Sequence, residues 1–214
     1  MHHLLLSIIE STLFVTALST DALIASFAYG SNKIKMPFLS VQVIAFLSTG
    51  ILGISLMLGV FIMPYIPNKL LKLISFLILL FLGIARLMDN IIKIIINKYL
   101  TVKKEIKFSM LNVNFILNIY ANPKDADADH SKTLSPKEAF SLGLALSIDS
   151  MAAGVGAALG NINIIAVLIL SLILSNLSIK TGELIGRKIS DKAPIQISWF
   201  GGVLLILLAF LRIL

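Results

Sequence analysis

The sequence predicts an all-α integral membrane protein whose six transmembrane helices form two inverted three-helix repeats. Three observations predict this fold: 57% of the residues are hydrophobic and only 14% charged, long apolar segments alternate with short polar breaks, and one pattern occurs in both halves, around Asp21 and around Asp149. A soluble domain carries about 25% charged residues and buries one apolar stripe per helix. The segments here are apolar around the whole helix, as spans that face lipid are.

Six segments reach the roughly 20 apolar residues that a membrane helix needs. They cover residues 4–29, 38–63, 70–92, 139–159, 162–185 and 194–214. Gly, Pro, Asn and charged residues mark the breaks between them. The predicted organisation is therefore a first repeat (residues 1–92), a cytoplasmic connecting loop (93–138) and a second repeat (139–214).

The basic residues predict the orientation of these helices. The side with the termini and the second and fourth loops carries about three Lys or Arg residues, and the other side about thirteen. Because cytoplasmic loops are enriched in basic residues, both termini are expected outside the cytoplasm of a multi-pass plasma-membrane protein. The net charge of +7 then reflects topology, so the lipid bilayer and not nucleic acid is the expected partner. Association into a homo-oligomer stays open.

An internal repeat supports the division into halves. Shifting the sequence so that Asp21 falls on Asp149 superposes identical polar residues at the start of each half. The matched pairs are Ser7 with Ser135, Glu10 with Glu138, Ser19 with Ser147, and Asp21 with Asp149; a weaker echo pairs Ser48 with Ser175 and Arg86 with Arg212. An odd number of helices per repeat inverts the second copy, as in many transporters whose site lies at the midplane.

Asp21 and Asp149 are the first candidate site residues. A carboxylate at the bilayer centre costs about 2.5–3.5 kcal/mol, so function is its default explanation, against a structural clamp between two helices. Small residues around both aspartates would let the helices approach closely. With the hydroxyls of Ser19 and Ser147, two facing carboxylates would form an oxygen site for a hard divalent cation.

Three glutamates admit structural explanations as well. Glu183 follows Lys180 by three residues, so an ion pair at the membrane interface competes with a role in transport. Glu10 and Glu138 each follow a serine by three residues, which is the pattern of a capping box at a helix start. Each of the two also lies eleven residues before an aspartate, on nearly the same helical face.

The connecting loop contains a pattern similar to an EF-hand calcium loop. Its candidate ligands are Asp127, Asp129, Ser131, Thr133 and Glu138. Lys132 replaces the glycine whose turn conformation such loops use, which would weaken Ca²⁺ binding. The alternative is a solvated acidic loop that ends in a capped helix.

The duplicated pattern Ala-Leu-Ser-x-Asp resembles the MntP-like manganese efflux family of the LysE transporter superfamily. The segments NKIKMPFLS and NPKDADADHSKTLSPKEA, with the short last helix, resemble a sporulation-associated branch of that family, except that its usual glycine is Lys132 here. The resemblance covers both halves. It implies a six-helix fold with Asp21 and Asp149 as the paired membrane aspartates. It also implies manganese export for the efflux members and an association with sporulation for the branch.

The function predicted from these observations is a secondary transporter that exports a divalent cation, with manganese as the substrate. It needs no cofactor, although Ca²⁺ could occupy the connecting loop. A non-transporting, calcium-responsive membrane scaffold of sporulating cells is the alternative. An intramembrane aspartyl protease ranks lower because the aspartates lack the sequence context of that class, so the chain is not expected to be an enzyme. It has no cysteine, which excludes thiolate metal sites and cysteine catalysis.

Overall fold

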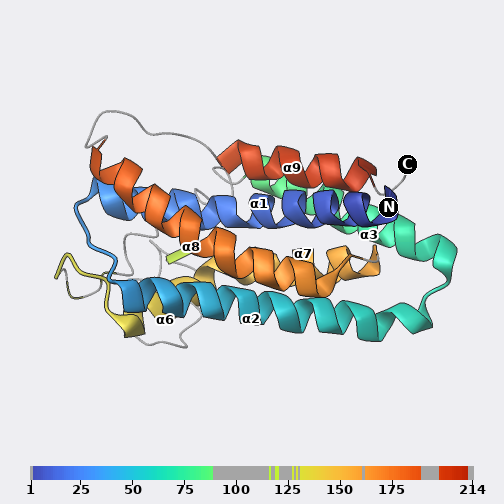
Figure 1. The fold of residues 1–214 in the computed structure, drawn as a ribbon, viewed down its shortest axis with the longest axis horizontal. Helices are drawn as coiled ribbons and strands as arrows, with labels where there is room; N and C mark the ends of the chain where they lie inside the picture. Colours follow the sequence, from blue (N-terminus) through green and yellow to red (C-terminus); the bar gives the residue numbers. More distant parts are fainter. Residues whose placement is uncertain are drawn as a thin grey trace, which may run out of the picture.

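The computed structural model is an elongated helical bundle whose helices run roughly along one long axis (Figure 1). It describes residues 2–88, 116, 119–120, 127, 129, 131–160, 162–188 and 198–211. The helices in these ranges are α1 (His2–Ser31), α2 (Phe38–Ile62), the 3₁₀ turn η1 (Met63–Tyr65), α3 (Asn68–Leu87), α6 (Pro136–Leu146), α7 (Ile148–Leu159), α8 (Ile164–Lys188) and α9 (Ser198–Leu211). The all-α prediction is confirmed.

Four helical segments in the described part of the chain are long and apolar enough to cross a bilayer. They are Ile8–Ser31, Phe38–Tyr65, Leu70–Leu87 and Ile164–Lys188. The pair α6 and α7 forms a fifth span if it is counted as one bent helix. The predicted sixth span, residues 194–214, contains the 14-residue α9, which is shorter than the roughly 20 residues of a full span.

The surface of the bundle is apolar, as lipid contact requires. Large side chains stay exposed along the helices, including Phe46, Phe61, Phe81 and Ile165, which are 61–72% exposed. Exposed apolar area on this scale does not occur on soluble monomers, so it supports the membrane assignment.

Close packing of α1 against α8 depends on glycine. Gly182 and Gly186 of α8 face the backbone of α1, and Gly30 of α1 faces the backbone of α8. A Cβ atom at any of these three positions would collide with a backbone carbonyl of the other helix. The two α8 glycines, four residues apart, therefore form the small-residue pattern that brings membrane helices into contact.

Two features of the predicted helices differ in the structure. The fourth predicted span breaks at Ser147, where α6 and α7 meet at an angle of 47°. Helix α1 begins at His2, so Glu10 lies inside the helix and not in a capping box at its start. The second predicted box is confirmed: Ser135 caps α6, and the side chain of Glu138 accepts a hydrogen bond from the Ser135 amide at 2.9 Å. Arg212 and most of the connecting loop lie outside the described residues.

Candidate functional site

The break at Ser147 interrupts a membrane helix near its middle. The Ser147 hydroxyl donates a 2.6 Å hydrogen bond to the Gly143 carbonyl and lies 3.2 Å from the hydroxyl of Ser48 on α2. Asp149 is in the first turn of α7, where the helix dipole favours a negative charge. Discontinuous helices in transporters expose helix ends and carbonyl oxygens that bind ions. The break therefore makes this level of the bundle a candidate ion site.

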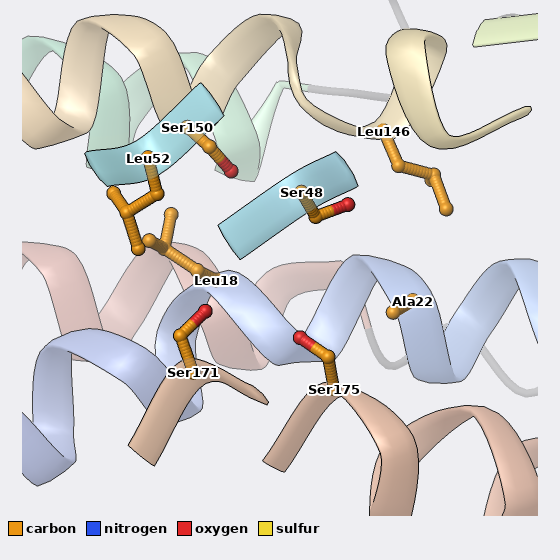
Figure 2. A pocket seen from close by; sticks show the side chains of 8 residues that line it. All are labelled: Leu18, Ala22, Ser48, Leu52, Leu146, Ser150, Ser171 and Ser175. Carbon is orange, nitrogen blue, oxygen red and sulfur yellow. The ribbon is translucent and has the colours of Figure 1, made fainter. Parts of the chain in front are cut away.

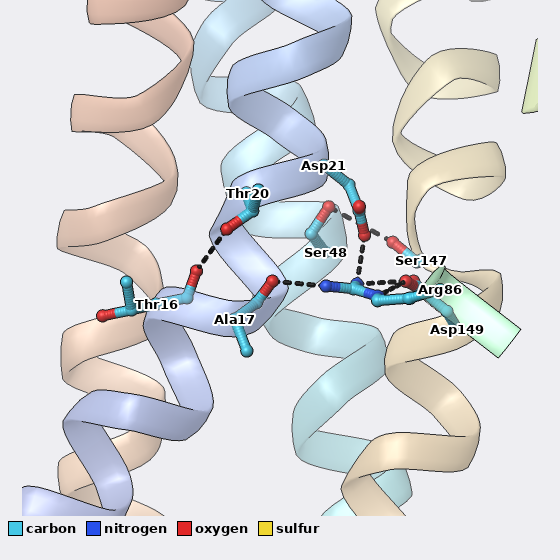
Figure 3. A network of polar contacts seen from close by, with 8 residues as sticks. All are labelled: Thr16, Ala17, Thr20, Asp21, Ser48, Arg86, Ser147 and Asp149. Carbon is cyan, nitrogen blue, oxygen red and sulfur yellow. Dashed lines mark hydrogen bonds and ion pairs between the residues drawn. The ribbon is translucent and has the colours of Figure 1, made fainter. Parts of the chain in front are cut away.

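Asp21 and Asp149 meet at a single guanidinium group, that of Arg86 in the last turn of α3 (Figure 3). Nη2 of Arg86 forms ion pairs with Oδ2 of both carboxylates, and its Nε donates to Asp149 Oδ2 at 3.1 Å. Its Nη1 donates to the Ala17 carbonyl of α1. The structure thus joins three helices through one cluster, which we call the Asp-Arg-Asp cluster.

The cluster is largely shielded from its surroundings. The side chain of Arg86 is 9% exposed, and those of Asp21 and Asp149 are 27% and 18% exposed. Its formal charge is −1, because two carboxylates face one guanidinium. The Asp149 Oδ1 atom is buried and has no hydrogen-bond partner among the described residues. The Asp149 Oδ1 atom is therefore an acceptor that a bound cation would satisfy.

Sequence reasoning missed the contribution of Arg86 to this cluster. It paired Arg86 with Arg212 across the two repeats, but it did not bring Arg86 to the aspartates. The available signal was its charge, since charged residues in membrane segments mostly face the interior of the bundle and pair with one another.

The two predicted serines occupy different places. Ser147 lies at the helix break beside Asp149, as described above. Ser19 is buried in α1, but it is two residues from Asp21 and so points to nearly the opposite face of the helix. Of the two hydroxyls, that of Ser147 is the one placed beside the cluster (Figure 3).

Glu183 lies near the end of α8 and holds the α1–α2 loop. Its side chain is 6% exposed, and its Oε1 accepts a 3.0 Å hydrogen bond from the Met36 amide. Arg187 forms an ion pair with the same oxygen, while Lys180 Nζ lies 4.0 Å from Oε2. These contacts satisfy the glutamate locally. They favour the ion-pair interpretation over a direct contact with a transported ion.

The acidic connecting loop forms a compact cluster of carboxylates. One oxygen from each of Asp127, Asp129 and Glu138 lies within 4.8 Å of the others, a spacing that could hold a metal ion. Asp127 is 4% exposed, and its Oδ1 is buried without a hydrogen-bond partner among the described residues. Burial raises the pKa of Asp127, whereas the hydrogen bond from the Ser131 amide lowers the pKa of Asp129.

The backbone of this loop already has the turn of a calcium-binding loop. Lys132 has φ of 59°, the left-handed conformation that the glycine of an EF-hand supplies. Its amide donates to Asp127 Oδ2 at 3.3 Å, and the Ser131 hydroxyl donates to the Thr133 carbonyl at 3.0 Å. The Lys132 side chain replaces glycine without preventing the turn.

The acidic loop is also attached to the membrane helices. Lys35 of the α1–α2 loop forms an isolated β-bridge with Thr133, and its amide donates to the Lys132 carbonyl at 2.8 Å. The Ser40 hydroxyl of α2 donates to the Leu134 carbonyl at 2.6 Å. The acidic loop, the α1–α2 loop and the end of α8 therefore form one connected layer at the same end of the bundle.

An apolar helical bundle with a charged cluster between its helices defines the class: a multi-pass membrane protein with the features of an ion transporter. Residues 90–214 match the family Mntp, described as "Putative manganese efflux pump". The "Probable sporulation protein YtaF" of Bacillus subtilis (strain 168) is 30% identical over 203 residues, which cover 94% of this chain and 97% of that protein. The chain therefore belongs to the MntP family, which confirms the resemblance noted in its sequence. No solved structure matches it.

Proposed function

We propose that the protein is a secondary transporter that exports a divalent cation, manganese, through a site formed by Asp21 and Asp149. The observation that carries this proposal is the convergence of both carboxylates on one cationic group beside a broken helix. Carboxylate, hydroxyl and carbonyl oxygens are the ligands that hard divalent cations prefer. The description of the family supports manganese as the ion.

In this proposal Arg86 is an internal cation that competes with the metal. Without metal, its guanidinium partly neutralises the two aspartates and prevents the cost of two unpaired charges in the membrane. A divalent ion at the same carboxylates would repel Arg86, and withdrawal of the arginine would leave the two carboxylates and the metal neutral together. Loading therefore requires a movement of α3 or of the Arg86 side chain, which links binding to a conformational change.

The energy for export would come from an ion gradient or from the membrane potential. The sequence contains no Gly-x-x-x-x-Gly-Lys-Ser/Thr pattern for binding nucleotide phosphates. Metal binding to the aspartates would compete with protons, so the same residues could couple proton entry to metal exit.

The proposal includes the full architecture expected from the sequence. Six spans in two inverted repeats would place the site between the halves, which would rock around it. Both termini would lie outside the cytoplasm, and the acidic loop inside it. Helices α1 and α7 support this arrangement, because each contributes one aspartate from an equivalent position of the repeat.

Reconstitution into liposomes tests the proposal. Wild-type protein should move manganese faster than empty liposomes, and Asp21→Asn and Asp149→Asn should each reduce the rate at least tenfold. Glu10→Gln is the matched control, because this glutamate is on α1 outside the cluster, and it should retain most of the flux. Equal flux in the wild type and both aspartate variants would remove the proposed site.

A second candidate function is a calcium-responsive membrane scaffold, and the acidic loop is the observation that favours it. We propose that Asp127, Asp129 and Glu138 bind Ca²⁺, with Ser131 and the Thr133 carbonyl as further ligands. The wild type should show saturable terbium luminescence that calcium displaces, and Asp127→Asn should weaken it. If aspartate variants without manganese flux still support sporulation while the loop binds calcium, the scaffold role replaces the transport role.

A further inference from the structure

A small cavity of about 20 Å³ lies between the two halves of the protein, and four serines face it. Ser48, Ser150, Ser171 and Ser175 come from three helices, and their side chains surround the cavity (Figure 2). Leu18, Ala22, Leu52 and Leu146 complete the wall. A cavity of this size holds roughly one water molecule or one bare monovalent ion no larger than water.

Two of these hydroxyls have no hydrogen-bond partner among the described residues. Ser150 and Ser175 are only 6% and 7% exposed, and neither hydroxyl forms a hydrogen bond with a described residue. The Ser171 hydroxyl lies 3.3 Å from Thr49 Oγ1, and that of Ser48 lies 3.2 Å from the Ser147 hydroxyl. The Ser150 and Ser175 oxygens are not among the fully buried atoms without a partner, so they remain accessible from the cavity and can bind a water molecule or an ion there.

The cavity also lies at equivalent positions of the two repeats. The shift that relates the repeats superposes Leu18 on Leu146 and Ala22 on Ser150. Ser48 and Ser175 match at a shift one position shorter, so three repeat-related pairs line one cavity. Equivalent residues of two copies meet only near the axis that relates them, which is where transporters with inverted repeats place their ion and substrate sites.

We propose that this serine cavity binds one monovalent cation of sodium's size, which couples to export. Four neutral hydroxyls can replace the weakly held hydration shell of a monovalent ion, whereas a divalent ion needs carboxylates to offset its dehydration. The adjacent Asp-Arg-Asp cluster has a formal charge of −1, and Ser150 directly follows Asp149 in the chain. This charge attracts a cation in the low-dielectric interior more strongly than it would in water.

The Ser147–Ser48 hydrogen bond connects the two sites. Ser48 lines the cavity, and Ser147 lies at the helix break beside Asp149. A cation in the cavity would recruit the Ser48 oxygen and would thereby change the contact of the α6–α7 break with α2. The coupling role rests on the proposed transport function, whereas sodium binding in the cavity does not.

Radioactive ²²Na⁺ binding to the purified protein in detergent tests the site directly. The wild type should bind one sodium ion per chain, and Ser150→Ala and Ser175→Ala should each weaken binding at least tenfold. Ser141→Ala is the matched control, because this serine is also buried in a membrane helix, has an unpaired hydroxyl among the described residues and does not line the cavity. It should bind sodium as the wild type does.

Two results would overturn the binding site: no saturable sodium binding by well-folded wild type, which would make the occupant water, or equal binding by the wild type and both cavity variants.

In liposomes, an inward sodium gradient should accelerate manganese export several-fold in the wild type but not in Ser150→Ala. If manganese is exported at the same rate with and without sodium, the coupling role is overturned but the binding site is not. Sodium binding without manganese flux under any gradient would refute the transport function and leave the cavity site standing.

Discussion

Removal of the Arg86 charge should destabilise the protein more than any other single charge removal in the membrane helices. The Arg86→Gln variant leaves two carboxylates of one cluster without their cationic partner and changes its formal charge from −1 to −2. Breaking a buried ion pair costs about 3–5 kcal/mol. Because the aspartate side chains are 27% and 18% exposed, we expect the lower end of this range, about 3 kcal/mol.

Neutral replacements distinguish a charge effect from lost packing. The triple variant Arg86→Gln, Asp21→Asn, Asp149→Asn has the same shortened side chain at position 86 as the single variant, keeps the shapes of the two aspartates and removes every charge, so it should recover the part of the lost stability that is due to charge. Lys72→Gln is the control, because this lysine is exposed on the same helix α3, and its replacement should change the free energy of unfolding by less than about 0.5 kcal/mol.

Unfolding in mixed micelles with increasing SDS, followed by circular dichroism, measures these differences. Manganese should also stabilise Arg86→Gln more than it stabilises the wild type, because the metal no longer competes with a guanidinium. The reasoning is refuted if Arg86→Gln unfolds within about 1 kcal/mol of the wild type, or if the triple variant is as unstable as the single one.

Three further predictions concern helix packing and the layer of loops. Gly182→Ala should destabilise the protein by about 1–3 kcal/mol, since its methyl group meets the α1 backbone, whereas Gly50→Ala, with open space around it, should be neutral or stabilising in thermal unfolding. Lys132→Gly should stabilise the folded protein by up to about 1 kcal/mol in thermal unfolding, because it relieves left-handed strain that the loop has without a metal, and Lys33→Gly, with φ of 60°, should have a similar effect. Glu183→Ala should accelerate hydrogen exchange of the Met36 amide by about tenfold or more, because this amide donates its hydrogen bond to Glu183. Unchanged exchange would show that Glu183 does not stabilise the α1–α2 loop.

The long membrane helices α2 and α8 could be predicted from hydropathy to within about three residues at each end. The second predicted span, 38–63, corresponds to α2 at Phe38–Ile62, and the fifth, 162–185, to α8 at Ile164–Lys188. These helices are continuous and face lipid, so a hydropathy average over a window as long as one span describes them well. Such an average cannot resolve a break at a single position, and Ser147 was therefore placed inside a continuous helix.

Local sequence did not contain a signal for that break. The same Ser-x-Asp pattern occurs at Ser19 and Asp21, where α1 continues unbroken, and the Ser147 side chain does not cap α7. The helix-start rule succeeded for Ser135 and Glu138, because Pro136 and the polar loop before it mark the start of α6.

The ion pairs of Arg86 could not be predicted because they depend on tertiary packing. Residues 21, 86 and 149 are separated by more than 60 positions from one another, and neither periodicity nor the repeat places α3 beside the aspartates. Helix packing decides this contact, through close approaches such as that of Gly156 on α7 to Ile78 on α3. The repeat could identify which residues are equivalent, but not which residues neutralise them.

The Asp-Arg-Asp cluster and the serine cavity beside it follow from one electrostatic requirement. Buried carboxylates are costly in a bilayer unless they are paired, and among the described residues Arg86 is the cation that pairs with both aspartates. The remaining charge explains why a hydroxyl-lined cavity beside the cluster is a candidate for a second ion. In the proposed transport cycle, a divalent ion that displaced Arg86 would leave the cluster neutral, whereas one added to the intact cluster would give it a net charge of +1. An exporter with this cluster is therefore expected to exchange cations at the aspartates, so that these carboxylates are compensated by a cation in every state of its cycle.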